Sequence, residues 1–121
     1  MVGMKTITVY GIPNCDTVKK ARTWLSEQGL DFVFHDFKKQ GVPSALLPDW
    51  LERLGHETLI NRKGPTWRNL DESVRNSVVD NASATPVMQA HSSTIKRPVV
   101  VWADGEVTVG FQPERFAQRL P

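Results

Sequence analysis

The chain has 121 residues, a length typical of one domain built around a single hydrophobic core. Its composition is 40% hydrophobic, 8% aromatic and 23% charged, which excludes a disordered, collagen-like or disulfide-stapled chain. Fifteen Lys and Arg residues against 13 Asp and Glu residues give a net charge of +2, too small to indicate a nucleic-acid partner. We therefore expect one domain over residues 1–121 that does not bind nucleic acid.

The first part of the chain predicts a strand, a helix and a second strand. Residues 5–10 alternate between polar and apolar side chains, as a strand with one buried face does. A helix is expected over 15–28, with Asn14 as its N-cap and Gly29 at its C-terminal end. Residues 31–37 alternate again. This order predicts a βαβ unit.

The middle of the chain, about 43–90, predicts a helical insert. One helix is expected over 44–55, and shorter helices over 70–75 and 83–89. A polar loop around residues 62–65 separates them.

The end of the chain predicts a β-hairpin and a last helix. Residues 97–102 and 106–109 have strand patterns, and Asp104-Gly105 between them is a hairpin turn signal. Residues 113–120 predict a helix with a proline in its first turn. The order β-α-β, helical insert, β-β-α predicts an α/β thioredoxin-like fold with a mixed four-stranded sheet.

The sequence contains one cysteine, Cys15, so it forms no intrachain disulfide and has too few thiols for a zinc cluster. His35, His56 and His91 lie far apart without the spacing of metal ligands. No segment approaches the roughly 18 apolar residues of a membrane span, and residues 1–5 lack a signal-peptide pattern. We expect a cytoplasmic monomer that binds no metal and no membrane.

Cys15 lies at the start of the first predicted helix, directly after a strand and a Pro-Asn turn. The N–H groups and positive partial charge of a helix N-terminus favour a thiolate, and Lys19 and Lys20 add positive charge. We therefore interpret Cys15 as a reactive thiol, although free cysteines are more commonly small buried apolar residues. Val18 stands where a dithiol oxidoreductase has its second cysteine. A second thiol must come from another molecule, and glutathione is the obvious donor in a cytoplasm.

Two basic segments are candidate anion sites. Arg97 and Pro98 directly precede the first strand of the hairpin, and a cis bond between them would turn the backbone towards Cys15. Arg97 would then bind a carboxylate, an oxyanion or the thiolate, the alternative being a solvated arginine. Arg62 belongs to a second basic loop, for which an ordinary charged surface turn is the better interpretation from the local sequence.

Three ordered motifs, at 8–21, 59–68 and 95–100, followed by Gly110-Phe111, carry a family resemblance. With these motifs the chain resembles the bacterial ArsC/Spx family, most closely its small YffB-type branch. The resemblance implies a thioredoxin-like fold in which Cys15 is the catalytic thiol and Arg97 precedes a cis proline. It also implies a set of substrate or glutathione contacts: Asn14, Thr17, Lys19, Arg62, Arg97 and Pro98.

The resemblance leaves three functions open. The first is a glutathione-dependent thiol oxidoreductase that acts through a mixed disulfide on Cys15. Glutathione would be its co-substrate, with no bound cofactor, and glutaredoxin or a thiol or disulfide substrate would be a further partner. The second is an arsenate reductase coupled to glutathione and glutaredoxin. The third is a non-enzymatic Spx-like regulator that binds RNA polymerase.

Two departures from the family patterns rank these functions. Arsenate reductases of the family surround their cysteine with three arginines, whereas this chain has Gly110-Phe111 at one of these places and Asn61 or Arg62 at another. The regulators often carry a Cys-x-x-Cys switch, which Val18 abolishes here. We therefore expect the glutathione-dependent thiol oxidoreductase.

Overall fold

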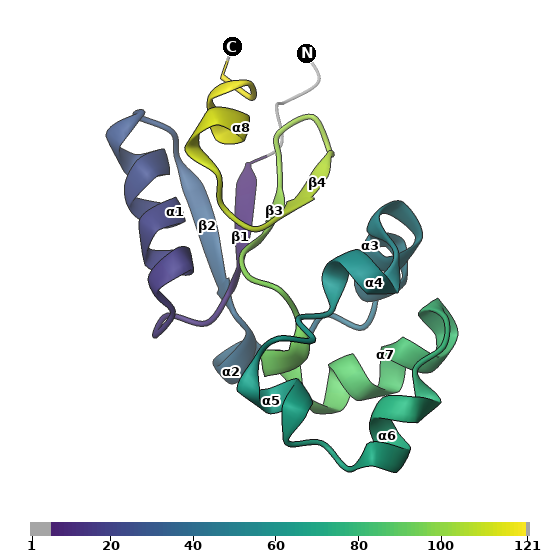
Figure 1. Cartoon of the computed structure of the whole chain (residues 1–121). Coiled ribbons are helices and arrows are strands. Elements are labelled where there is room, and N and C mark those ends of the chain that lie inside the picture. The colour runs from purple at the N-terminus through teal and green to yellow at the C-terminus, as the bar shows by residue number, and fades with distance from the viewer. Residues whose placement is uncertain (1–5, 121) are drawn as a thin grey trace. The chain divides into compact units, whose positions relative to one another are not determined.

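The computed structural model describes residues 6–120, which divide into two compact units (Figure 1). The described part of the first unit comprises residues 6–36 and 97–120, and the second unit is Phe37–Lys96. Lys5, the first residue of the first predicted strand, lies outside the described residues. Within 6–120, no helix is both long and apolar enough to span a membrane.

The first unit is built on a mixed four-stranded sheet. Its strands are β1 (Ile7–Gly11), β2 (Phe32–Asp36), β3 (Val99–Val101) and β4 (Val107–Val109), in the order β2-β1-β3-β4. β1 pairs in parallel with β2 and antiparallel with β3, which pairs antiparallel with β4. The helices of this unit are α1 (Asp16–Glu27) and α8 (Pro113–Ala117). The predicted α/β thioredoxin-like sheet and its hairpin are confirmed.

One hydrophobic core joins α1 and α8 to the sheet. Alternate residues of a strand point to the same face, and residues four apart on a helix do so as well. Ala21 and Leu25 of α1 therefore meet the strand residues of this face together with Phe116 of α8. The other members of the cluster are Ile7, Val9, Val100 and Trp102. Figure 1 shows α1 running alongside the sheet.

The C-terminal end of α1 is as the sequence predicts. Gly29 has a φ of +71°, a left-handed conformation that suits glycine. Its N–H donates to the carbonyl of Ser26, and the N–H of Leu30 donates to the carbonyl of Leu25, each at 3.0 Å. These two bonds form a Schellman motif and satisfy the last carbonyls of the helix.

The N-terminal end of α1 differs from the prediction by one residue. The N-cap is Cys15, whose backbone is extended, with φ −143° and ψ 121°. Its carbonyl accepts a hydrogen bond from the N–H of Lys19 at 2.9 Å. The N-cap role predicted for Asn14 is therefore wrong, because the extended backbone continues through Cys15 before the helix begins.

The second unit consists of short helices. They are α2 (Phe37–Gln40), α3 (Leu47–Leu54), α4 (His56–Leu59), α5 (Pro65–Arg68), α6 (Glu72–Ser77), α7 (Asn81–Ala90) and the 3₁₀-helix η1 (Ser92–Thr94). This is the predicted helical insertion, and the compact unit extends beyond 43–90 at both ends. An isolated bridge between Ile60 and Ile95 pairs two of its extended residues.

Three predicted boundaries in this region are wrong. Phe37 begins α2 instead of ending the preceding strand, and its buried ring packs near that of Trp50, with centroids 6.4 Å apart. The helix expected over 44–55 begins only at Leu47, because residues 44–46 first make a turn and Pro48 then occupies the first helical turn. The polar loop leads directly into α5, which starts with Pro65.

Candidate active site

The reactive thiol predicted from the sequence lies between β1 and the first turn of α1. β1 ends at Gly11, and a Cβ atom placed there would lie 2.8 Å from Cγ2 of Val18. Glycine therefore allows the end of the strand to approach the helix closely. Val18 is fully buried, whereas Cys15 is partly exposed. The thiol is thus supported by a packed first turn while it stays accessible.

The surroundings of Cys15 lower the pKa of its thiol. Partial burial is the largest influence and raises the pKa, because it disfavours the charged thiolate. The backbone N–H of Val18, the hydrogen bond and positive charge of the Arg97 side chain, and the backbone N–H of Thr17 act in the opposite direction and outweigh it. Since the thiolate is the nucleophile in disulfide exchange, this environment favours reactivity.

Arg97 is the charged side chain that the fold brings to the thiol. The Arg97–Pro98 peptide bond is cis, as expected, and directly precedes β3. Pro98 is buried, its carbonyl accepts a hydrogen bond from the N–H of Gly110 at 2.9 Å, and the Nε atom of Arg97 is shielded from solvent. A partly buried guanidinium beside a thiolate is a fixed positive charge for anionic groups.

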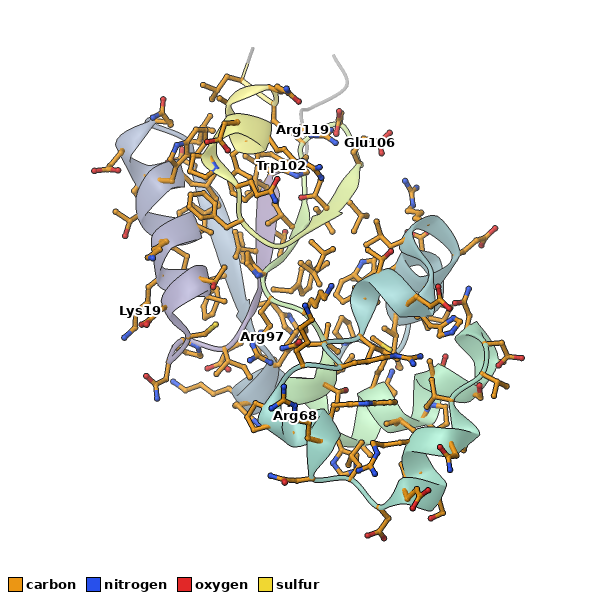
Figure 2. The ribbon with its side chains drawn as sticks, viewed as in Figure 1. Lys19, Arg68, Arg97, Trp102, Glu106 and Arg119 are labelled. Atoms are coloured by element: carbon orange, nitrogen blue, oxygen red, sulfur yellow. The ribbon has the colours of Figure 1, made fainter. Side chains whose placement is uncertain are left out.

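The remaining site residues predicted near the thiol have different positions. Thr17 is exposed, and its backbone N–H acts on Cys15. Asn14 is exposed in the loop before Cys15. In Figure 2, Lys19 projects from the outer side of α1, away from Arg97. The lowering of the Cys15 pKa comes from Val18, Arg97 and Thr17 rather than from Lys19 and Lys20, which corrects our expectation for the two lysines.

Arg62 and Asn61, the alternatives for the insert position, belong to the second unit. Arg62 is exposed, and its guanidinium carbon lies 5.4 Å from the ring centroid of Trp67, within range of a cation–π contact. The N–H of Asn61 donates to the carbonyl of Thr94 at 2.8 Å, and a Cβ atom on Gly64 would lie 2.8 Å from its Nδ2. Asn61 thus packs within a tight turn, whereas Arg62 presents a charge to solvent.

Sequence reasoning missed the contribution of Val18. We considered this residue only as the absent second cysteine, yet the hydrogen bond of its backbone N–H is the largest single interaction that lowers the pKa of Cys15. A backbone donor leaves no side-chain signal, so only its place in the first turn of a helix indicates it. Across residues 6–120, no three His, Cys, Asp or Glu side chains gather as metal ligands would.

Comparison with known protein families and solved structures identifies proteins that are similar to this chain. A protein-family model described as the ArsC family matches residues 10–119. A solved structure of a YffB protein is 43% identical and has a TM-score of 0.89, with 96% of this chain and 100% of that chain covered. An arsenate reductase (ArsC) related protein from Brucella melitensis is 46% identical, with a TM-score of 0.73 and coverage of 96% and 95%.

More distant similarity extends to transcriptional regulators. The global transcriptional regulator Spx from Bacillus subtilis is 20% identical over 117 residues, covering 95% of this chain and 87% of that protein. The chain is thus similar both to a protein named after arsenate reductase and to regulators.

Proposed function

The chain belongs to the ArsC family, and we propose that it is a glutathione-dependent thiol oxidoreductase with Cys15 as its catalytic residue. The observation that supports this function is the partly exposed thiol at the N-terminus of α1, whose pKa is lowered by backbone N–H groups and Arg97. Because Cys15 is the one cysteine of the chain, the second thiol of the reaction comes from another molecule.

The reaction has two thiol–disulfide exchanges. The Cys15 thiolate attacks the glutathione sulfur of a mixed disulfide, a new S–S bond forms, and the substrate leaves as a thiolate. A second glutathione thiolate then attacks the glutathione sulfur on Cys15. This step releases oxidised glutathione and restores the Cys15 thiolate, so the substrate sulfur is reduced and the sulfur of the second glutathione is oxidised.

Arg97 would stabilise the attacking thiolate or bind a glutathione carboxylate. Asn14, Lys19, Arg62, Pro98 and the backbone of Thr17 are proposed as further contacts of substrate or glutathione.

Arsenate reduction is the second candidate, and one observation favours it: the 46% identical relative is described as related to arsenate reductase. The residues that follow β4, Gly110-Phe111, carry no positive charge. An arsenate anion beside Cys15 would therefore have fewer charge-assisted hydrogen bonds, each worth about 1.5–3 kcal/mol. We rank it below exchange with glutathione.

Two assays on the same preparation test the proposal. Reduction of a small glutathione mixed disulfide should proceed with the natural chain and stop in Cys15→Ser, while arsenate turnover with glutathione and glutaredoxin stays near background. Strong arsenate turnover would establish the second candidate instead. Inactivity in both assays, together with binding of purified RNA polymerase, would support a Spx-like regulator.

A further inference from the structure

The backbone at the end of the β3–β4 hairpin is tied to the residue next to Arg97. The N–H of Gly110, the first residue after β4, donates to the carbonyl of Pro98 at 2.9 Å. β3 and β4 pair antiparallel, so this hydrogen bond extends their ladder by one residue pair beyond both strands. Figure 1 shows the chain continuing from β4 to α8. The segment after β4 therefore restrains the backbone from which the Arg97 side chain leaves.

Pro98 passes this restraint on to Arg97. The pyrrolidine ring fixes the φ angle of a proline at about −65°, and Pro98 is buried. Because Gly110 also holds its carbonyl, the peptide unit between Arg97 and Pro98 has little freedom to rotate. The direction of the Arg97 side chain depends on this unit. Since Arg97 supplies a hydrogen bond and a positive charge that favour the Cys15 thiolate, a rotation here would change the environment of the thiol.

The conformation of Gly110 suits glycine. Its φ is +84°, in a region that residues with a side chain rarely adopt. Among residues 6–120, nothing beyond its chain neighbours lies within 4 Å of a Cβ atom placed there, so a substitution would not clash. The requirement is therefore one of backbone conformation. An alanine at this position would either strain the backbone or give up the hydrogen bond to Pro98.

The chain after Gly110 cannot move freely to relieve such strain, because Phe111 is anchored. Its ring meets that of Phe116 edge to face with centroids 4.8 Å apart, and Phe116 is buried in the core. Trp24 of α1 meets the same Phe116 ring at 5.6 Å. Gly110 is thus held between the carbonyl of Pro98 and an aromatic cluster. A change of its φ must displace one of these two contacts.

We propose that Gly110 is a positioning residue for the thiol exchange: its N–H holds the carbonyl of Pro98 and thereby directs the guanidinium of Arg97 towards Cys15. The inference rests on the proposed function, to which it adds a residue that contacts neither the substrate nor the reacting sulfur. The uncharged end of the hairpin thus acts on the site through its backbone.

Alkylation of Cys15 by neutral iodoacetamide reports the thiolate and tests this role. In Gly110→Ala we expect alkylation below the thiol pKa to slow about threefold, which corresponds to a pKa raised by about half a unit. In Arg97→Gln/Gly110→Ala the rate should be no lower than in Arg97→Gln alone, because Gly110 acts through Arg97. Gly110→Asn should slow alkylation less than Gly110→Ala, since asparagine adopts a positive φ more readily.

Gly105→Ala is the matched control. Gly105 lies in the turn of the same hairpin with a φ of +89°, and a Cβ atom there also meets nothing within 4 Å among residues 6–120. The urea midpoint of unfolding should fall in both alanine variants, because both strain the hairpin. Alkylation should slow only in Gly110→Ala.

Three results would overturn the inference. They are unchanged alkylation in both Gly110 variants, equal slowing in Gly105→Ala, and further slowing when Gly110→Ala is added to Arg97→Gln. If Gly110→Ala does not fold, the same comparisons are made with Gly110→Asn. If the natural chain does not reduce a glutathione mixed disulfide, the proposed function fails, while the alkylation rates still decide whether Gly110 positions Arg97.

Discussion

The two units of the chain are stabilised in different ways. The first has a paired four-stranded sheet whose inner face packs on a 12-residue helix. In the second, α2, α4 and α5 have four residues each. Helices of this length are unstable in isolation. They therefore depend on tertiary packing and on individual side-chain hydrogen bonds.

Asn81 shows how the second unit is held together. Its Oδ1 accepts a hydrogen bond from the N–H of His56 at 2.9 Å, and its Nδ2 donates to the carbonyl of Leu51 at 3.0 Å. One side chain thus links the start of α7 to the end of α3 and the start of α4. The comparison teaches that Cys15, the predicted reactive thiol, lies on the unit with the more regular backbone, which suits a site that requires fixed geometry.

Truncation in the core of the first unit should have the largest effect. Leu25 is fully buried between α1 and the sheet, so Leu25→Ala should lower the free energy of unfolding by about 2–5 kcal/mol. Urea denaturation measures this loss. Val33→Ala is the control, because this residue of β2 is 53% exposed, and a change below about 0.5 kcal/mol is expected. Equal losses in the two variants would contradict the assigned core.

A side chain at the end of β1 should disturb both stability and the thiol. In Gly11→Ala the new Cβ atom would lie 2.8 Å from the fully buried Val18 side chain, which must move. We expect a loss of about 1–3 kcal/mol in unfolding free energy. We also expect a raised pKa of Cys15, because the Val18 N–H supports the thiolate. The pH dependence of alkylation measures the second effect.

Thr17→Ala is the control for this experiment. It keeps the backbone N–H that acts on Cys15 and removes only an exposed side chain. The alkylation curve should therefore stay unchanged. A shift as large as that of Gly11→Ala would show that the Thr17 hydroxyl acts on the thiol.

In the second unit, loss of one polar link should lower stability and leave the thiol intact. Asn81→Ala removes the hydrogen bonds to Leu51 and His56, and about 1–2 kcal/mol of unfolding free energy should be lost. Asn69→Ala, at an exposed position, should change it by less than about 0.5 kcal/mol. An unchanged unfolding free energy in Asn81→Ala would contradict the view that the second unit depends on individual side-chain hydrogen bonds.

Sequence patterns indicated the first unit better than the second for a physical reason. The hairpin has two alternating strands, and Gly105 takes the positive φ of 89° that the Asp-Gly turn signal requires. A helix of four residues such as α4 completes about one turn, so it shows no apolar periodicity. The hydrogen bonds of Asn81 could not be predicted from the local sequence, because its two partners lie 25 and 30 residues away.

The same distinction applies to the site. The residue type and position of Cys15 and Arg97 indicated a thiol and an anion-binding side chain next to predicted elements. The packing of Trp24 and Phe111 on Phe116 depends on tertiary structure, so it was not predictable from the sequence. The N-cap was misplaced by one residue because Asn14 is the better capping side chain by preference, whereas the backbone begins its helix after Cys15.

Removal of Arg97 should slow exchange without unfolding the first unit. Its hydrogen bond and charge lower the pKa of Cys15, so Arg97→Gln should raise this pKa. Reduction of a glutathione mixed disulfide should fall by about tenfold, as expected for a hydrogen bond to a charged group. Arg119→Gln is the control, because Arg119 pairs with Asp104 at 3.5 Å near the other end of the sheet (Figure 2). Similar losses in both variants would contradict a specific role.

The smallest effect should be a pH dependence of stability that comes from the thiol. Because the folded pKa of Cys15 is lowered, the native state binds the thiol proton less tightly than the unfolded chain does. The resulting stabilisation is fully present above the unfolded thiol pKa of about 8.5 and disappears as the pH falls through the folded pKa. The unfolding free energy of the natural chain should therefore rise with pH over this interval relative to Cys15→Ser, which has no thiol. Parallel curves of unfolding free energy against pH for the two proteins would mean that folding does not change the pKa of the thiol. The N-terminus of α1 would then not stabilise the thiolate.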